Sequence, residues 1–215
     1  MIPMLRKQLR PAIVATFLLM IVTGLIYPAI VTGLAQLLFP RQANGSLVAN
    51  AKGQPVGSEL IGQGFARPEY FHSRPSAAGN GYDDTLSSGT NKGPTDRKLA
   101  DTLIAGAVDS AVAQEGAVKG HVPSDLVTSS GSGLDPHISP ASAEVQIARV
   151  SRARGATTEA VRALVQQHTE GRQFGFLGES RVNVLLLNRA LDATIPTRHA
   201  VAPPASAVQN TRPIK

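Results

Sequence analysis

The chain has 215 residues, which is enough for one domain, alone or with appendages. Lys and Arg outnumber Asp and Glu by 21 to 15, but no run of five basic residues occurs, so the charge argues against a nucleic-acid partner. Cysteine is absent, which excludes disulfides, thiol catalysis and thiolate metal sites.

The first element is an apolar segment without charged residues, from Pro11 to Pro40. Residues 12–34 alone would form a helix about 34 Å long, enough to cross a bilayer. The alternatives are a buried core helix and a cleaved signal peptide. The segment is longer than a signal peptide's apolar core and lacks a small-residue cleavage site, so we expect an uncleaved transmembrane helix.

The charges around this helix predict its orientation. Arg6, Lys7 and Arg10 precede it, and such clusters stay in the cytoplasm. Residues 1–11 are therefore expected in the cytoplasm and residues 42–195 outside. In a bacterium with two membranes, the chain would cross the inner membrane once and place its domain in the periplasm.

Two features within the span suggest local irregularity and contact. Pro28 cannot bond to the carbonyl of Gly24, which predicts a kink. Ala29 and Gly33 form a small-xxx-small pair that would let another helix approach, so both are candidate partner-binding residues. The alternative is that Gly and Pro are simply common in membrane helices.

The segment after the span predicts a hairpin and then a long loop. "SLVAN" and "PVGSELIG" flank "AKGQ", which is typical of two short strands joined by a turn. Residues 64–95 are dominated by Gly, Ser, Asn, Asp and Pro, yet four of the chain's nine Phe and Tyr lie there. Because disordered segments are poor in aromatic residues, we expect an ordered loop.

The aromatic residues of this loop are interleaved with arginines, a pattern typical of interface anchors. The candidate partner-binding residues are Phe65, Arg67, Tyr70, Phe71 and Arg74. The competing interpretation is a small internal core, completed by Phe174 and Phe176.

Three helices are predicted next. The first is capped by Thr95 and carries apolar residues from Leu99 to Val112 at helical spacing. The second runs from Ser139 to Gly155, and the third from Thr157 or Thr158 to Gly171. Residues 182–193 could begin as a strand, but a helix is favoured. Residues 196–215 have no apolar period and are expected to be disordered. The expected fold is α+β: one N-terminal transmembrane helix, then a small extracytoplasmic domain with long ordered loops.

The sequence contains few residues whose type and spacing suggest catalysis. Ser132, Asp135 and His137 would suit an anchored periplasmic hydrolase, but a Ser–His–Asp relay requires geometry rather than proximity in sequence. Asp and Ser are also common turn and cap residues. The five histidines lack metal-ligand spacing. We therefore expect no catalytic residue, no metal and no tightly bound cofactor. A free-standing binding module is a further alternative.

Three long motifs carry a family resemblance. They are "GSELIGQGFARPEYFHSRPSAA" with "SSGTNKGPT", "DLVTSSGSGLDPHISPASAEVQIARV", and "GFLGESRVNVLLLNRALD". With the anchor, they resemble the KdpC family, the accessory subunits of the bacterial potassium-transporting Kdp P-type ATPase, from the anchor to about Asp192. The tail after Thr194 is longer than usual in that family and carries no motif.

The resemblance implies an accessory subunit in high-affinity, ATP-driven potassium uptake. It implies three partners within the Kdp complex: a channel-like potassium-binding subunit, an ATP-hydrolysing subunit and a small fourth subunit. Potassium and ATP would be handled by these partners. The family's accessory subunit is needed for assembly and has been described as a catalytic chaperone that raises the ATP affinity of the ATP-hydrolysing subunit.

A direct ATP contact conflicts with the predicted topology, because ATP is hydrolysed in the cytoplasm while the domain is expected outside. If the contact were made, the backbone of residues 129–133 could form an anion nest. The candidate nucleotide residues would then be Ser130 and Ser132, with Gln146 pairing with adenine.

Overall fold

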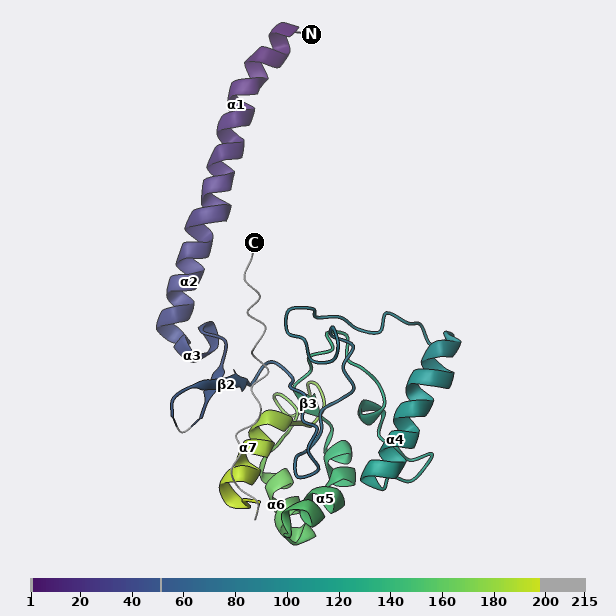
Figure 1. The fold of residues 1–215 in the computed structure, drawn as a ribbon. Coiled ribbons are helices and arrows are strands. Elements are labelled where there is room, and N and C mark those ends of the chain that lie inside the picture. The colour runs from purple at the N-terminus through teal and green to yellow at the C-terminus, as the bar shows by residue number, and fades with distance from the viewer. Residues whose placement is uncertain (1, 51, 198–215) are drawn as a thin grey trace, which may run out of the picture. The chain divides into compact units, whose positions relative to one another are not determined.

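The structure is a computed structural model that describes residues 2–50 and 52–197 (Figure 1). The tail predicted to be disordered, residues 196–215, falls outside the described residues except for residues 196 and 197. The described chain separates into two compact units, and the boundary between them in the sequence lies between Leu60 and Ile61. The hairpin after the span therefore belongs to the N-terminal unit.

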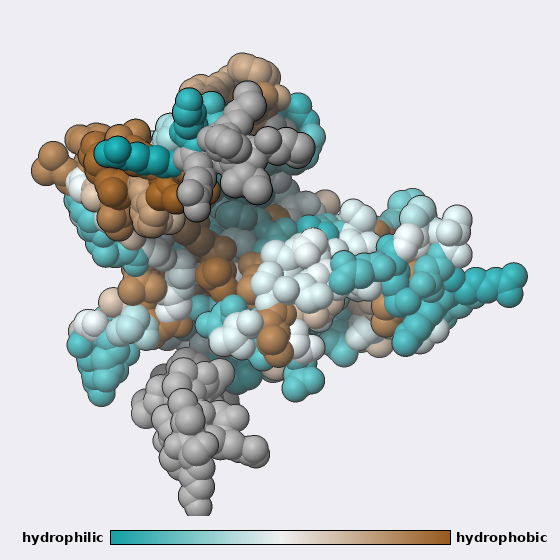
Figure 2. Space-filling model, turned by 90° about the horizontal axis from the view of Figure 1, so that it is seen from above, coloured by the Kyte–Doolittle hydropathy of each residue, from teal (hydrophilic) through white to brown (hydrophobic). Residues whose placement is uncertain are grey.

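The N-terminal unit is built on one long helical segment. It consists of α1 (Ile2–Ile21), the π-helical turn η1 (Val22–Ile26) and α2 (Tyr27–Leu38), with helical backbone angles across both junctions. Residues 7–38 have a mean hydropathy of 2.3 in their most apolar window, and none of that window is buried within the chain. Figure 2 shows apolar side chains gathered on this helix in brown. By length and composition it is suited to cross a membrane.

The irregularity predicted in the span takes the form of a π-helical turn. Residues 22–26 adopt the wider helix immediately before Pro28, whose ring removes a backbone donor from the next turn. Within this turn, the Thr23 hydroxyl donates to the carbonyl of Leu19 at 2.7 Å. Local side-chain bonds of this kind satisfy backbone carbonyls where a membrane helix departs from regular geometry.

A short helix and the predicted hairpin complete the unit. Helix α3 (Pro40–Ala43) is followed by the antiparallel strands β1 (Leu47–Ala49) and β2 (Pro55–Ser58). The side-chain oxygen of Asn50 accepts the N–H groups of Lys52 and Gln54, which closes the turn between the strands.

The second unit is an α+β domain, as predicted. Its helices are η2 (Lys98–Ile104, π-helical), α4 (Ala105–Glu115), η3 (Ser124–Leu126, 3₁₀), α5 (Pro140–Arg154), α6 (Thr158–Gln167) and α7 (Val184–Thr194). Its strands are β3 (His137–Ile138), β4 (Thr169–Glu170) and β5 (Arg181–Asn183), which form an antiparallel sheet in the order β3-β5-β4.

Local sequence signals explain where the helices begin and end. Ser139, Thr157 and Asn183 each accept a backbone N–H at the start of α5, α6 and α7. Gly155 ends α5 with a positive φ of 65°. Three boundaries differ from prediction. Asp96 caps the first helix in place of Thr95, and that helix starts in π form. The third helix ends at Gln167 because the chain turns into β4, and residues 181–183 form a strand before α7.

The core lies between α5, α6, α7 and the sheet. Figure 1 shows these three helices grouped together, with α4 to one side. The buried core residues are Phe71, Ile138, Ala143, Ile147, Val150, Val161, Leu164, Val165, Val182, Val184, Leu187 and Leu191. All but one come from regular elements. The exception is Phe71, which reaches the core from the long loop.

The loop of residues 64–95 contains neither helix nor strand, and close backbone contacts hold it in place. The N–H of Ser88 donates to the carbonyl of Ser132 at 3.0 Å. At Gly133, φ is 69° and a Cβ atom would lie 2.5 Å from the carbonyl oxygen of Ser88. Only glycine fits both the conformation and the approach. The loop is ordered because the segment around residue 133 is shaped to receive it.

Candidate functional site

The ring of Phe71, predicted to bind a partner, lies inside the domain. Its side chain is fully buried among α5, α7 and β5. The docking interpretation of Phe71 is therefore corrected: the ring is a core residue, because a chain segment with two prolines still needs apolar burial to be ordered. The alternative core interpretation is right for this ring, although Phe174 and Phe176 do not complete it.

Two buried side-chain amides hold the backbone of Phe71 and His72. Asn188 accepts the N–H of Phe71 at 2.8 Å and donates to its carbonyl at 2.9 Å. Gln146 likewise accepts the N–H of His72 at 2.7 Å and donates to its carbonyl at 3.1 Å. Each amide replaces the neighbouring strand that an extended segment would otherwise need, so loop residues 71–72 are held by α5 and α7.

This arrangement overturns the adenine-pairing role considered for Gln146. Its side chain is fully buried, and both ends of its amide are engaged with His72. Its oxygen also accepts from Arg149 at 2.9 Å. Pairing with a base would leave the two partly buried backbone groups of His72 without these partners, which is costly.

An ionic cluster ties helix α4 to the same loop. Arg149 donates to Glu115 at 2.6 Å and to the carbonyl of Tyr70 at 2.8 Å. The ring of His72 lies 3.2 Å from the second oxygen of Glu115. Burial alone would raise the pKa of Glu115, but the bonds from His72 and Arg149 outweigh it and leave the pKa below its usual value. Glu115 is therefore a charged anchor at the end of α4.

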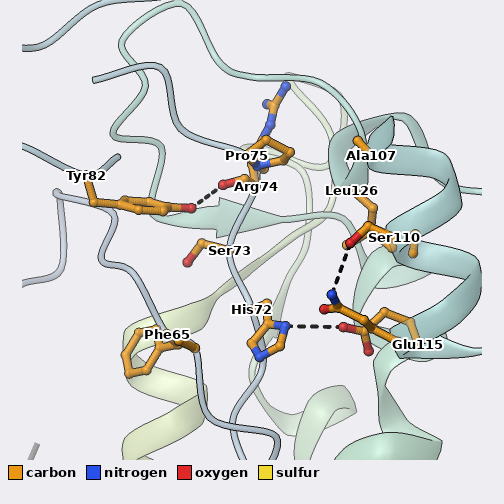
Figure 3. Close-up of a pocket in the computed structure, with 13 residues that line it drawn as sticks. Phe65, His72, Ser73, Arg74, Pro75, Tyr82, Ala107, Ser110, Glu115 and Leu126 are labelled. Carbon is orange, nitrogen blue, oxygen red and sulfur yellow. Dashed lines mark hydrogen bonds and ion pairs between the residues drawn. The ribbon is translucent and has the colours of Figure 1, made fainter. Parts of the chain in front are cut away.

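A cavity of about 400 Å³ separates the loop from α4 (Figure 3). Its walls carry the rings of Phe65 and Tyr82, the Glu115–His72 pair and the small residues of one face of α4. The carboxylate of Glu115 and the ring of His72 point toward each other across it, and the amide of Gln114 donates to Ser110 at its rim. On the α4 side of the cavity, Glu115 is thus paired with His72 and Gln114 with Ser110.

Tyr70 and Arg67 lie at the edge of the domain, next to the last helix. The Tyr70 hydroxyl donates to Asp192 at 3.0 Å and accepts from Arg67 at 2.8 Å. Burial and the Asp192 charge raise the pKa of Tyr70. Beneath them the fully buried guanidinium of Arg154 donates to Asp192 and to two backbone carbonyls. Phe65 packs on Tyr70 at 5.5 Å between ring centroids, so these residues form one half-exposed edge.

Arg74 is turned toward the chain itself. It donates to Asp135 at 3.0 Å and to the hydroxyl of Thr128 at 3.3 Å, while its own carbonyl accepts from the hydroxyl of Tyr82. Burial raises the pKa of Tyr82 to about 12. Burial would raise the pKa of Asp135 as well, but bonds from His137 and Arg74 lower it overall. Arg74 therefore joins the long loop to the segment before β3.

The three residues of the hydrolase alternative do not form a relay. Asp135 lies 3.6 Å from Nδ1 of His137, but its closer partner is Arg74. The Ser132 hydroxyl accepts from the N–H of Leu134 at 3.1 Å and lies 3.4 Å from the Ser130 hydroxyl. A nucleophile would instead have to bond to the base.

Ser130 and Ser132, the nucleotide candidates, belong to the turn that receives the loop. The carbonyl of Ser132 accepts from Ser87 and Ser88, and the carbonyl of Ser130 accepts from the N–H of Gly133. That N–H is one of the groups an anion nest would need. Across residues 2–50 and 52–197, no group of three or more His, Asp and Glu side chains is arranged to hold a metal.

Comparison with known proteins assigns the chain to a family. Residues 9–193 match the family described as KdpC, K+-transporting ATPase, c chain. The chain belongs to the KdpC family. It is 59% identical to the potassium-transporting ATPase KdpC subunit of Gemmatimonas aurantiaca, over 91% of this chain and 97% of the relative. The KdpC subunits of Koribacter versatilis and Myxococcus xanthus are 51% and 58% identical, over 89% and 80% of this chain and 97% and 82% of theirs.

The KdpC match includes the span, on which two partner-binding candidates lie. Ala29 and Gly33 are exposed on α2, and a Cβ atom at Gly33 would meet no other atom within 4 Å. The surface that they share is therefore open within this chain. Helix contact through it stays a prediction.

The KdpC match also includes Phe174 and Phe176, which the competing interpretation of the loop aromatics used to complete a small internal core. Their exposed fractions are 87% and 70%. That part of the competing interpretation is wrong, because both rings lie in a tight turn closed between Gln173 and Leu177 and stay exposed there.

Proposed function

We propose that this chain is a non-catalytic accessory subunit of a complex that takes up potassium at the expense of ATP. The observation that carries the proposal is the match of residues 9–193 to the c chain of the K+-transporting ATPase. The engagement of Ser132, Asp135 and Gln146 in bonds within the domain supports a role in assembly rather than chemistry.

The proposed topology follows from charge and hydropathy. The single apolar helix spans the bacterial inner membrane, with the basic N-terminus in the cytoplasm and the α+β domain in the periplasm. A helix of this length, free of internal burial, needs the bilayer or another helix as its surroundings.

The proposed partners are the channel-like potassium-binding subunit, the ATP-hydrolysing subunit and the small fourth subunit of the complex. Ala29 and Gly33 offer a close approach to a neighbouring membrane helix. The half-exposed edge formed by Phe65, Arg67 and Tyr70 offers a second contact outside the membrane. Arg74 contributes indirectly, because it holds the loop that carries this edge.

A chaperone effect on ATP binding would be exerted without contact to the nucleotide. In the proposed topology the domain and ATP are on opposite sides of the membrane. A change in the ATP affinity of the ATP-hydrolysing subunit would then pass through the span or through another member of the complex.

Purification from membranes tests the proposal. A tag placed on this chain, in cells that also express the proposed partner subunits, should retain two large membrane proteins in stoichiometric amounts after solubilisation. A second form of the tagged chain carries Gly33→Leu, which obstructs the small-residue surface. This form should retain less of the partner proteins while its outer domain stays folded. Recovery of the tagged chain alone, with both forms equally free of partners, would contradict the assignment.

A further inference from the structure

The turn that carries Phe174 and Phe176 is a surface the proposed function does not use. We name residues 172–179 the aromatic turn. Phe174 and Phe176 are 87% and 70% exposed, and Leu177 is 48% exposed. Large apolar side chains that project together from a polar surface mark an interaction site. Here they occupy the tip of a turn whose flanking positions are polar or glycine.

The backbone of the turn points to the same conclusion independently. Phe174 has a φ of 53°, a left-handed conformation that is strained for a bulky side chain. Glycine would relieve the strain, as at Gly175 and Gly178, where φ is 82° and 75°. The ring of Phe174 receives almost no cover from its own chain that could offset this cost. A strained and exposed aromatic residue indicates a role outside the chain.

The turn pairs part of its own backbone. Gln173 and Leu177 exchange two hydrogen bonds of 2.9 Å. The N–H groups of Gly175 and Phe176 donate to carbonyls of the same turn, at 3.1 and 3.2 Å. This internal pairing lowers the number of backbone groups that would have to give up water when the turn enters the interfacial region.

Charges at the base of the turn are neutralised in pairs. Arg172 lies 2.8 Å from Glu179, and Arg181 lies 2.9 Å from Glu170. The base therefore has no excess charge for an anionic surface to attract or repel. Any attraction to the turn comes from its three apolar side chains.

The size of the apolar tip distinguishes between two kinds of partner. A covered aromatic side chain buries about 150–250 Å², so the exposed parts of the three residues offer about 400 Å². A stable protein interface takes about 800 Å² from each partner. Insertion into a bilayer has no such minimum for a tethered chain, because residues 39–60 link the domain to the span and keep a membrane at high local concentration.

We propose that the aromatic turn inserts its three apolar side chains into the interfacial region of the bilayer that holds the span. The interaction needs neutral lipid only and is insensitive to salt, since the nearby charges are paired. It gives the outer domain a second contact with the membrane. The proposal rests on the span and not on the assignment to a transport complex.

The absence of tryptophan from the chain makes a direct test available. The full chain with Phe174→Trp is reconstituted in phosphatidylcholine vesicles, with and without brominated acyl chains. Bromine quenches only a tryptophan that reaches the acyl region. The matched control is Val118→Trp, because Val118 is also apolar and exposed, at 68%, but lies in a different loop, the one that follows α4. Circular dichroism confirms that each variant is folded.

The expected result is that the tryptophan of Phe174→Trp loses most of its fluorescence in brominated vesicles and is protected from quenching by acrylamide in the water. The tryptophan of Val118→Trp should show neither effect. Adding Phe176→Ser to the first variant should restore part of the fluorescence, and raising the salt concentration should change nothing. Equal behaviour of the two tryptophans overturns the proposal. So does quenching that requires anionic lipid at low salt, or protection that develops only when partner proteins are bound.

Discussion

Replacing Asn188 by leucine isolates the most unusual feature of the domain, the use of side-chain amides to hold an extended segment. Asn188 is 1% exposed, and its amide contacts both backbone groups of Phe71. Leucine has nearly the same volume and shape, so the change removes two hydrogen bonds while leaving little space unfilled. The N–H and the carbonyl of Phe71 would then be buried without partners.

The expected cost can be worked from these two groups. A buried donor or acceptor left unpaired costs about 1–3 kcal/mol, so the pair should cost about 2–6 kcal/mol. A domain of ordinary stability has about 5–15 kcal/mol in total. Asn188→Leu should therefore lower the denaturation midpoint strongly. It should also free the loop of residues 64–95, because the attachment of Phe71 is where that loop meets the core.

Denaturation of the full chain in detergent measures the first effect, followed by far-UV circular dichroism. Limited proteolysis measures the second, through cleavage within the loop under native conditions. Gln166→Leu is the matched control, since Gln166 is exposed on α6 and surface changes usually stay within about 0.5 kcal/mol. If Asn188→Leu were as stable as this control and equally resistant to protease, the hydrogen-bond account of the loop would be refuted.

Four further outcomes are expected. Phe71→Ala should cost about 3–5 kcal/mol of folding stability, seen in the same denaturation assay, because the ring is fully buried. A reporter that is active only in the periplasm, fused after Lys215, should be active; an active cytoplasmic reporter would reverse the topology. Ser132→Ala and His137→Ala should leave potassium-stimulated ATP hydrolysis by the purified complex within about a hundredfold of the unmodified complex, whereas a larger loss with assembly unchanged would revive the enzyme alternative. The Glu115 carboxylate has a lowered pKa in the folded state, so its contribution to folding stability is present above its usual pKa of about 4.3 and is lost as the pH falls through the folded value. The difference in stability between the unmodified chain and Glu115→Gln should therefore shrink in acid denaturation curves. A difference that stays constant with pH would contradict the ionic anchor.

Patterns with a local cause could be predicted from the sequence. The span, the hairpin and helices α5 and α6 follow from hydropathy, from turn residues and from caps such as Ser139 and Thr157. These signals act within a few residues, so one sequence is enough to find them. The cap at Asp96 is also local, because its side chain accepts from the N–H groups of Lys98 and Leu99, and it lies one residue after the predicted Thr95. The strand at residues 181–183 depends instead on contacts with other elements. Strand β5 in particular exists only because β3 and β4 lie on either side of it.

The candidate site was less predictable because its key residues look ordinary. Gln146 and Asn188 occupy positions on the apolar faces of α5 and α7, alongside Ala143, Val150 and Leu191. A polar side chain in such a register is a signal that it must find a partner when buried. The sequence does not say which partner, and the partner in each case lies at least 74 residues away in the loop. Without that pairing, the aromatic residues of the loop fit docking and core interpretations equally well.

The engagement of Gln146 also constrains how this chain could influence ATP. Its amide is bonded to His72 and Arg149, and Arg149 in turn holds Glu115 at the end of α4. A ligand that drew Gln146 out of these bonds would have to release the loop, the ionic cluster and the end of α4 together. That release would oppose binding. Under the proposed topology, an effect on nucleotide affinity is therefore better carried by the span, where Ala29 and Gly33 are open to a neighbouring helix.

Small-to-large changes at Ala29 and Gly33 should then alter the ATP affinity of the assembled complex, while Ser130→Ala should leave it unchanged. Measuring ATP dependence of hydrolysis in both sets of complexes separates the two routes, and a loss confined to Ser130→Ala would restore the nucleotide-contact hypothesis.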